Sequence, residues 1–125
     1  MRLLLDTNAL LWTLAGAPRI APVSEMILSP QTEVFVSAAS FWEIAIKSSI
    51  GKLAFDVREI RSASIASGFT ELPVIGFHCE ELAKLPLLHR DPFDRMIVAQ
   101  AISEPMRLLT GDTQLADYTQ LVQLI

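Results

Sequence analysis

Four acidic residues stand at positions where a folded chain could bring carboxylates together: Asp6, Glu43, Asp94 and Asp112. Two of them directly follow apolar strand-like segments, and the other two lie within apolar helix-like stretches. Carboxylates that converge cannot all stay ionised without cations, and hard divalent ions such as Mg²⁺ or Mn²⁺ prefer oxygen ligands. A site of this kind activates water and stabilises the charge that develops on a phosphodiester.

Each acid also has an ordinary structural interpretation. Asp6 and Asp112 follow strands, where aspartate commonly caps the next helix or closes a turn. Glu43 stands four residues before Lys47, the spacing of an ion pair on an exposed helix face. Ser40 and Glu43 match a capping box, but Ser37 ends the preceding strand-like segment and is the better N-cap, which places Glu43 nearly two turns inside the helix. Spacing alone does not decide between capping and chemistry.

The segment "HRDPFDRMIVAQA" (89–101) contains two aspartates, Asp91 and Asp94, for which different roles are predicted. Pro92 suits the first helical position, so Asp91 is predicted to be the N-cap, and it also has a favourable ion-pair spacing to Arg95. Asp94 instead shares a helix face with apolar residues three, four and seven positions later, namely Ile97, Val98 and Ala101. We expect Asp94 to border the core or a cleft, with a capping-box acid as the alternative.

The elements that must position these acids alternate along the chain. Strands are predicted at 2–5, 33–37, 107–110 and 121–125, with a short strand or turn at 69–74. Helices are predicted at 8–16, 22–29, 38–51, 56–67, 79–85 and 92–103, with one further turn near 113–117. This alternation predicts an α/β fold with a mostly parallel sheet covered on both faces. In such folds, sites form beyond the carboxyl ends of the strands.

Composition restricts the class of protein further. The chain has 125 residues, of which 51% are hydrophobic and 19% charged, so a single domain with one packed core is expected. No apolar run reaches the roughly 18 residues of a membrane span, and the N-terminal segment is interpreted as a strand and a helix rather than a targeting segment. With one cysteine, no disulfide within the chain is expected. We therefore expect a cytoplasmic protein. A net charge of −4 argues against simple electrostatic binding of nucleic acid, but not against a nuclease whose acids surround cations.

Four segments together resemble the PIN-domain ribonucleases, and most closely the VapC-like toxins of bacterial toxin–antitoxin pairs. They are "LLLDTNALLW", "VSAASFWEIAIKSSIGKL", "HRDPFDRMIVAQA" and "LLTGDTQLADY", and they follow the family's order over nearly the whole chain. The resemblance implies that residues 1–125 form one PIN domain, a three-layer α/β/α sandwich with about five strands. It also implies a homodimer and a cognate antitoxin protein as partner.

The resemblance further implies cleavage of RNA by a water activated on Mg²⁺ or Mn²⁺, leaving a 5′-phosphate and a 3′-hydroxyl. Carried over onto this sequence, Asp6, Glu43 and Asp94 are the main catalytic and metal-binding acids, and Asp112 is the fourth, more variable one. Asn8 and Thr110 lie beside the site as supporting residues. Asp91 belongs to the family's "RDPFDR" signature, but the role implied for it is structural, in agreement with its predicted position as a helix N-cap.

Basic residues could hold the RNA, with Lys47, Arg90 and Arg95 as the selected candidates and Lys52, Arg58 and Arg61 as further ones. A solvated face or ion pairs are the alternative for each of them. Trp12 and Trp42 are interpreted as core or interface residues rather than platforms for base stacking. His89, next to Arg90, could contact phosphate, but it is interpreted as an ordinary loop histidine.

Other functions remain open from sequence alone. The chain could be a catalytically silent PIN-like binding module, or a housekeeping PIN nuclease that is not a toxin. Phosphotransfer folds built on a similar sheet need a second acid close after the first strand, where this chain has Asn8. The discriminating observation is whether the carboxyl groups of Asp6, Glu43 and Asp94 come together.

Overall fold

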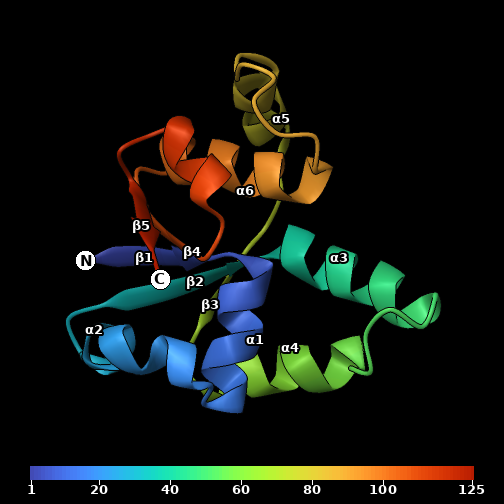
Figure 1. The fold of residues 1–125 in the computed structure, drawn as a ribbon, viewed down its shortest axis with the longest axis vertical. Helices are drawn as coiled ribbons and strands as arrows, with labels where there is room; N and C mark the ends of the chain where they lie inside the picture. The colour runs from blue at the N-terminus through green and yellow to red at the C-terminus, as the bar shows by residue number, and fades with distance from the viewer.

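Five parallel strands form one sheet in the computed structural model, which describes residues 1–125 (Figure 1). The strands are β1 (Arg2–Leu5), β2 (Glu33–Ser37), β3 (Thr70–Leu72), β4 (Arg107–Thr110) and β5 (Val122–Leu124). Their order is β3-β2-β1-β4-β5, and every neighbouring pair is parallel. The predicted mostly parallel sheet is therefore confirmed, with no antiparallel edge.

Helices cover both faces of the sheet, which completes the α/β/α sandwich (Figure 1). They are α1 (Thr7–Ala15), α2 (Ser24–Leu28), α3 (Ala38–Ser49), α4 (Val57–Ala66), α5 (Gly76–Ala83) and α6 (Pro92–Ser103). Two short 3₁₀ helices, η1 (Pro18–Val23) and η2 (Thr113–Asp117), connect α1 to α2 and β4 to β5. In Figure 1, α5 and α6 lie above the sheet, whereas α1, α2 and α4 lie below it.

Alternation along the central strands divides the core into two layers. Leu3 and Leu5 point to the face covered by α1, α3 and α4, where they pack in a cluster with Leu10 and Ile44. Leu4 points to the opposite face and packs with the buried side of α6, including Ile97 and Val98. Because both faces of β1 are buried beyond the exposed Arg2, the rest of the strand is a continuous apolar run, as expected for a central parallel strand.

Predicted caps are confirmed at the starts of three helices, α1, α3 and α6. Asp6 accepts a hydrogen bond from the Ala9 N–H, and Ser37 accepts one from the Ala39 N–H. Asp91 accepts from two backbone N–H groups in the first turn of α6, those of Phe93 and Asp94. These caps satisfy donors that an α-helix leaves unpaired at its start.

Three local predictions are corrected. The segment predicted as a helix over 22–29 is divided, with Pro22 inside η1 and α2 starting only at Ser24. The helix predicted from residue 79 begins at Gly76, where the side chain of buried His78 accepts the N–H of Ile75. Asp91 forms no ion pair with Arg95, because its carboxylate faces backbone N–H groups while Arg95 donates to the Leu85 carbonyl.

The six α-helices are short, and the longest two, α3 and α6, have 12 residues each. None of the six is both long enough and apolar enough to cross a bilayer.

Candidate metal centre

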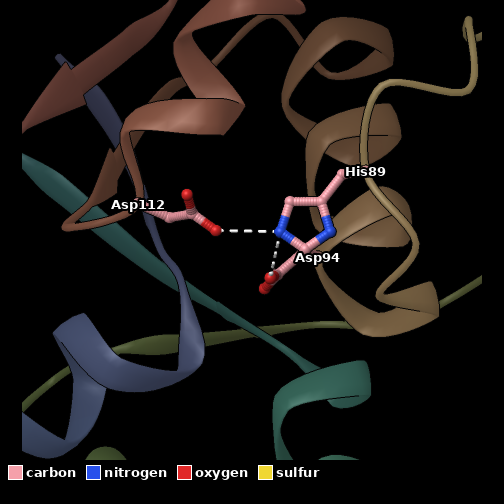
Figure 2. Close-up of side chains that lie close together, drawn as sticks. All are labelled: His89, Asp94 and Asp112. Atoms are coloured by element: carbon pink, nitrogen blue, oxygen red, sulfur yellow. Dashed lines mark hydrogen bonds and ion pairs between the residues drawn. The ribbon is translucent and has the colours of Figure 1, made fainter.

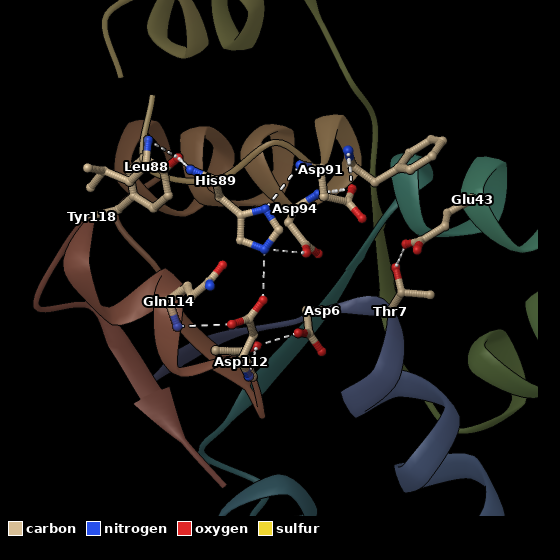
Figure 3. A network of polar contacts seen from close by, with 12 residues as sticks. Asp6, Thr7, Glu43, Leu88, His89, Asp91, Asp94, Asp112, Gln114 and Tyr118 are labelled. Atoms are coloured by element: carbon tan, nitrogen blue, oxygen red, sulfur yellow. Dashed lines mark hydrogen bonds and ion pairs between the residues drawn. The ribbon is translucent and has the colours of Figure 1, made fainter. Parts of the chain in front are cut away.

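Strand order explains why the acidic residues meet at one edge of the sheet. Asp6 follows β1 in the middle of the sheet, and Asp112 follows the adjacent strand β4. The neighbour on the other side, β2, runs directly into α3, which carries Glu43 in its second turn. Asp94 comes from the first turn of α6 above the sheet (Figure 3). All four elements thus deliver carboxylates to the carboxyl end of the central strands, where ligands of parallel sheets bind.

Asp6 is held on both of its carboxylate oxygens. Oδ1 accepts the Ala9 N–H at 2.8 Å, and Oδ2 accepts the hydroxyl of Thr110, which ends β4. The residue is only 4% exposed, and burial raises its pKa above the ordinary value. The charges of Glu43 and Asp112 raise that pKa further, whereas the two hydrogen bonds lower it. Capping and membership of the acidic centre are therefore not alternatives for Asp6, since the same carboxylate does both.

Glu43 is a buried carboxylate with two polar partners. The hydroxyl of Thr7 donates to Oε1 at 2.6 Å, and the ammonium of Lys47 lies 2.5 Å from Oε2. Glu43 is buried whereas Lys47 remains 41% exposed, so the predicted i,i+4 pair exists but only its basic end faces solvent. The contact with Glu43 and the charges of Asp91 and Asp94 raise the pKa of Lys47. Lys47 is thus a cation paired with Glu43 at the edge of the acidic centre.

Asp94 carries the least compensated charge in the centre. Oδ2 lies 3.5 Å from Nε2 of His89, and Oδ1 has no hydrogen-bonding partner within the protein. Burial raises the pKa of Asp94 to about 7, and the neighbouring charges of Asp91, Asp6 and Glu43 act in the same direction. The prediction that Asp94 lies on the buried side of its helix is confirmed by its partly buried position beside Ile97 and Val98.

His89 joins Asp94 to Asp112 (Figure 2). Its Nε2 atom lies 2.9 Å from Oδ2 of Asp112, while Oδ1 of Asp112 accepts the Gln114 N–H and so caps η2. The candidate ligand atoms of His89, Asp94 and Asp112 all lie within 4.8 Å of one another. This compact group includes two of the four predicted acids and one residue that the sequence did not single out.

The four acids do not form a single tight cluster of ligand atoms. Asp6 and Glu43 are outside the group defined by His89, Asp94 and Asp112. They are nevertheless close enough for their charges to raise the pKa of Asp94. The charges of Glu43 and Asp112 in turn raise the pKa of Asp6. In Figure 3, Asp6, Asp94 and Asp112 face a common space, and Glu43 lies with Thr7 to one side of it.

The predicted supporting residues divide into two groups. Thr110 is buried and contacts two acids, because its hydroxyl donates to Asp6 and accepts the backbone N–H of Asp112 at 3.0 Å. Asn8 and Arg90 are exposed, and Arg95 donates to the Leu85 carbonyl at 3.3 Å. Among the further basic candidates, Arg61 is paired with Glu71 at 2.6 Å, as expected for an ordinary surface ion pair.

The two tryptophans occupy different environments. Trp12 is partly buried against the core below the sheet, and the guanidinium of Arg19 lies 4.4 Å from the centre of its ring. Trp42 is 63% exposed, and its ring forms a T-shaped pair with that of Phe93, with ring centres 5.0 Å apart. Trp42 and Phe93 line an apolar hollow of about 280 Å³ between α3 and α6.

Sequence reasoning missed three polar residues that organise the centre. Thr7 donates to Glu43 and is 3.0 Å from the hydroxyl of Ser40, and Tyr118 accepts the backbone N–H of His89 at 2.9 Å. His89 itself was interpreted as an ordinary loop residue. The position of Thr7 directly after Asp6 and of His89 two residues before Asp91 offered a weak signal, but their partners come from distant segments.

Fold and site together define an α/β protein with an acidic centre at the carboxyl end of a parallel sheet. The PIN domain family model matches residues 3–121, and the chain therefore belongs to the PIN domain family. No curated protein sequence matches the chain at a significant level.

Solved structures of toxin–antitoxin proteins share the fold. The chain is similar to one in VapBC2 from Rickettsia felis bound to a promoter DNA fragment, with TM-score 0.73, 16% identity, and 100% and 98% of the two chains covered. It is similar to one in VapBC-1 from nontypeable Haemophilus influenzae, with TM-score 0.66, 19% identity, and 99% and 98% covered. A toxin–antitoxin complex from Klebsiella pneumoniae gives TM-score 0.63, 21% identity, and 96% and 94% covered. At these identities the likeness concerns the fold.

Proposed function

We propose that this PIN domain, formed by residues 1–125, is an endoribonuclease that depends on Mg²⁺ or Mn²⁺. The observation that carries this proposal is the state of Asp94, a partly buried carboxylate whose pKa is raised to about 7 by burial and by the neighbouring charges of Asp91, Asp6 and Glu43. Such an arrangement is unfavourable for the protein by itself and becomes favourable once a divalent cation neutralises it.

The donor set fits a hard divalent ion. Asp6, Glu43, Asp94 and Asp112 offer carboxylate oxygens, and Oδ1 of Asp94 has no partner within the protein. Oxygen ligands supplemented by water are the environment that Mg²⁺ and Mn²⁺ prefer. When bound, the ion supplies a water that ionises near neutral pH and a positive charge beside the phosphate.

The chain's own groups then have defined tasks. The Ala9 N–H and the Thr110 hydroxyl keep Asp6 oriented toward the centre, and Thr7 does the same for Glu43. Lys47, close to Glu43 but 41% exposed, is placed to approach a phosphate of the RNA. Arg90 is exposed in the loop before α6 and offers a second positive charge. We assign the catalytic and metal-binding role to the four acids and RNA binding to these bases, with Asn8 and Arg95 as weaker candidates.

We also propose that the nuclease is the toxin of a toxin–antitoxin pair in the cytoplasm. Support comes from the three solved structures above, two of which are VapBC proteins and one of which is called a toxin–antitoxin complex. A cognate antitoxin and a homodimer are the partners that follow from this proposal. A housekeeping PIN nuclease and a catalytically silent module are the alternatives.

A cleavage assay tests the nuclease proposal. Purified protein is incubated with structured and single-stranded RNA in EDTA, Mg²⁺ or Mn²⁺, and the ends of the products are identified. We expect cleavage only with metal, and its loss in Asp6→Asn and Asp94→Asn. Asp91→Asn is the matched control, because asparagine also caps helices and the predicted activity is retained.

Two results would contradict these proposals separately. Metal-independent cleavage, or equal loss of activity in the Asp91→Asn and Asp94→Asn variants, contradicts the assigned centre. The toxin role is tested by expression in a bacterial host, where the wild-type chain should arrest growth and Asp94→Asn should not. Cleavage in vitro without growth arrest favours the housekeeping nuclease.

A further inference from the structure

His89 is the one side chain that lies against the carboxylates of both Asp94 and Asp112. Its backbone N–H donates to the hydroxyl of Tyr118 at 2.9 Å, and Leu88 donates to the same oxygen at 3.2 Å. The side chain is 15% exposed. The loop before α6 is therefore attached to η2, and the imidazole has a restricted orientation between them (Figure 3).

The contacts of the ring define which nitrogen carries the proton. Nδ1 of His89 lies 3.0 Å from the backbone N of Asp91. A backbone N–H can only donate, so Nδ1 must present its lone pair, and the proton of the neutral ring is on Nε2. That Nε2–H points at Oδ2 of Asp112, 2.9 Å away, with Oδ2 of Asp94 at 3.5 Å.

This tautomer decides between two roles for His89. Distances alone would make it the third ligand of an ion bound with Asp94 and Asp112. A ring nitrogen that carries a proton has no lone pair for a metal ion, so ligation through Nε2 would need the proton moved to Nδ1, opposite the Asp91 N–H. A fixed N–H donor between two carboxylates instead holds them at a defined separation. Oδ1 of Asp94 then has no partner within the protein, and Oδ1 of Asp112, which accepts the Gln114 N–H, keeps a second lone pair.

We infer that His89 is a positioning residue of the centre and not a metal ligand: its Nε2–H holds Asp112, and more loosely Asp94, in the geometry that receives a divalent cation. This inference rests on the proposed function, because it assumes that the four acids bind metal. Hydrogen bonds to ligating groups commonly change metal affinity by about 10-fold to 100-fold when they are removed. The carboxylate that depends most on this bond is Asp112, whose side chain is 34% exposed on a short loop.

Two variants test whether metal binding depends on the N–H donor of His89. His89→Leu removes both ring nitrogens, whereas the amide of His89→Gln can place an N–H donor near the position of Nε2. Mn²⁺ binding is measured without RNA, from the electron paramagnetic resonance signal of the free ion. We expect His89→Leu to bind Mn²⁺ about 10-fold more weakly than wild type, and His89→Gln to stay closer to wild type than to His89→Leu. Equal or tighter Mn²⁺ binding by His89→Leu would overturn the inference.

Nitrogen NMR of the ring supplies a readout that a merely structural role would not change. In wild-type protein, without metal and with saturating Mg²⁺, we expect a protonated Nε2 and an unprotonated Nδ1 for His89. The chain has two histidines, so the spectrum of His89→Leu assigns the signals. A ring protonated on Nδ1 in the presence of Mg²⁺ would overturn the inference in favour of ligation through Nε2.

Failure of this inference is distinguishable from failure of the proposed function. Weaker Mn²⁺ binding by His89→Leu, with Nε2 of the wild-type ring still protonated in Mg²⁺ but without RNA cleavage, overturns the nuclease and retains the positioning role. Metal-dependent cleavage by wild type, with unchanged Mn²⁺ binding in His89→Leu, overturns the positioning role and retains the nuclease. A wild-type chain that binds no Mn²⁺ overturns both.

Discussion

Replacing Asp94 by asparagine should make the metal-free protein more stable while it abolishes metal-dependent activity. In the folded protein the pKa of Asp94 is raised to about 7 from an ordinary value of 3.8. Between these two pH values the folded state retains a proton that the unfolded state has lost. Stability therefore falls as pH rises through this window, and the destabilisation is fully present only above pH 7.

The difference between the two pKa values corresponds to at most about 4 kcal/mol. Solvent reaches the Asp94 side chain, which is 19% exposed, so we expect a smaller measured effect of about 2 kcal/mol. Asparagine has no charge at any pH and is similar in size. The Asp94→Asn variant should thus match wild type near pH 4 and exceed its unfolding free energy by about 2 kcal/mol at pH 8.

Urea unfolding in EDTA at several pH values between 4 and 8 measures this difference. Asp117→Asn is the matched control, because it removes the same charge from an exposed position in η2 and should show no such pH dependence. Added Mn²⁺ should reverse the ranking at pH 8, because an ion that binds only the folded wild type stabilises it. A variant that is less stable than wild type at pH 8, or a difference that does not change with pH, would refute the reasoning.

Three further substitutions test the supports of the centre. Gly111→Ala should lower stability by about 1–3 kcal/mol and weaken Mn²⁺ binding, because the added Cβ would lie 2.8 Å from the Trp12 ring beside Asp112; unchanged thermal unfolding and affinity would contradict this. Thr7→Val keeps the shape but removes the donor to Glu43, and should cost about 1–3 kcal/mol in urea unfolding, with Thr13→Val as a control on the same helix. Tyr118→Phe removes the acceptor of two backbone N–H groups and should speed hydrogen exchange at Leu88 and His89, with little effect on α3 amides; unchanged exchange at those two amides would argue against the attachment.

In the acidic centre, one carboxylate can cap a helix and also take part in the site. Asp6 caps α1 through one oxygen, and its other oxygen binds Thr110 beside the remaining acids. Asp112 caps η2 through Oδ1 and binds His89 through Oδ2. A carboxylate has two oxygens, so a cap that uses one of them also fixes the direction of the other. Asp91 differs from these acids: its Oδ1 caps α6, and it acts on the centre only through its charge, which raises the pKa of Asp94 and of Lys47.

Local sequence determined most of the elements of this protein. Strands 33–37 and 107–110 and the helix 92–103 were predicted with their observed bounds, because apolar runs, Pro92 and the caps are local signals. The same signals separated Asp91 from Asp94, since a helix that begins at Pro92 makes Asp91 its N-cap and leaves Asp94 free of that role in the first turn. Prediction was wrong around Pro22 and at the start of α5, where no polar N-cap marks the helix.

Tertiary structure alone decided which side chains meet. The parallel order β2-β1-β4 brings Asp6 to Thr110 across 104 positions of sequence, and it brings Thr7 to Glu43. His89 acquired its significance from Asp112 and Tyr118, which belong to the segment after β4. Local spacing describes the geometry of one helix or strand, whereas hydrogen bonds and charge repulsion depend on distances between elements. The residue types that could bind a metal ion were therefore visible in the sequence, and the partners that orient them were visible only in the fold.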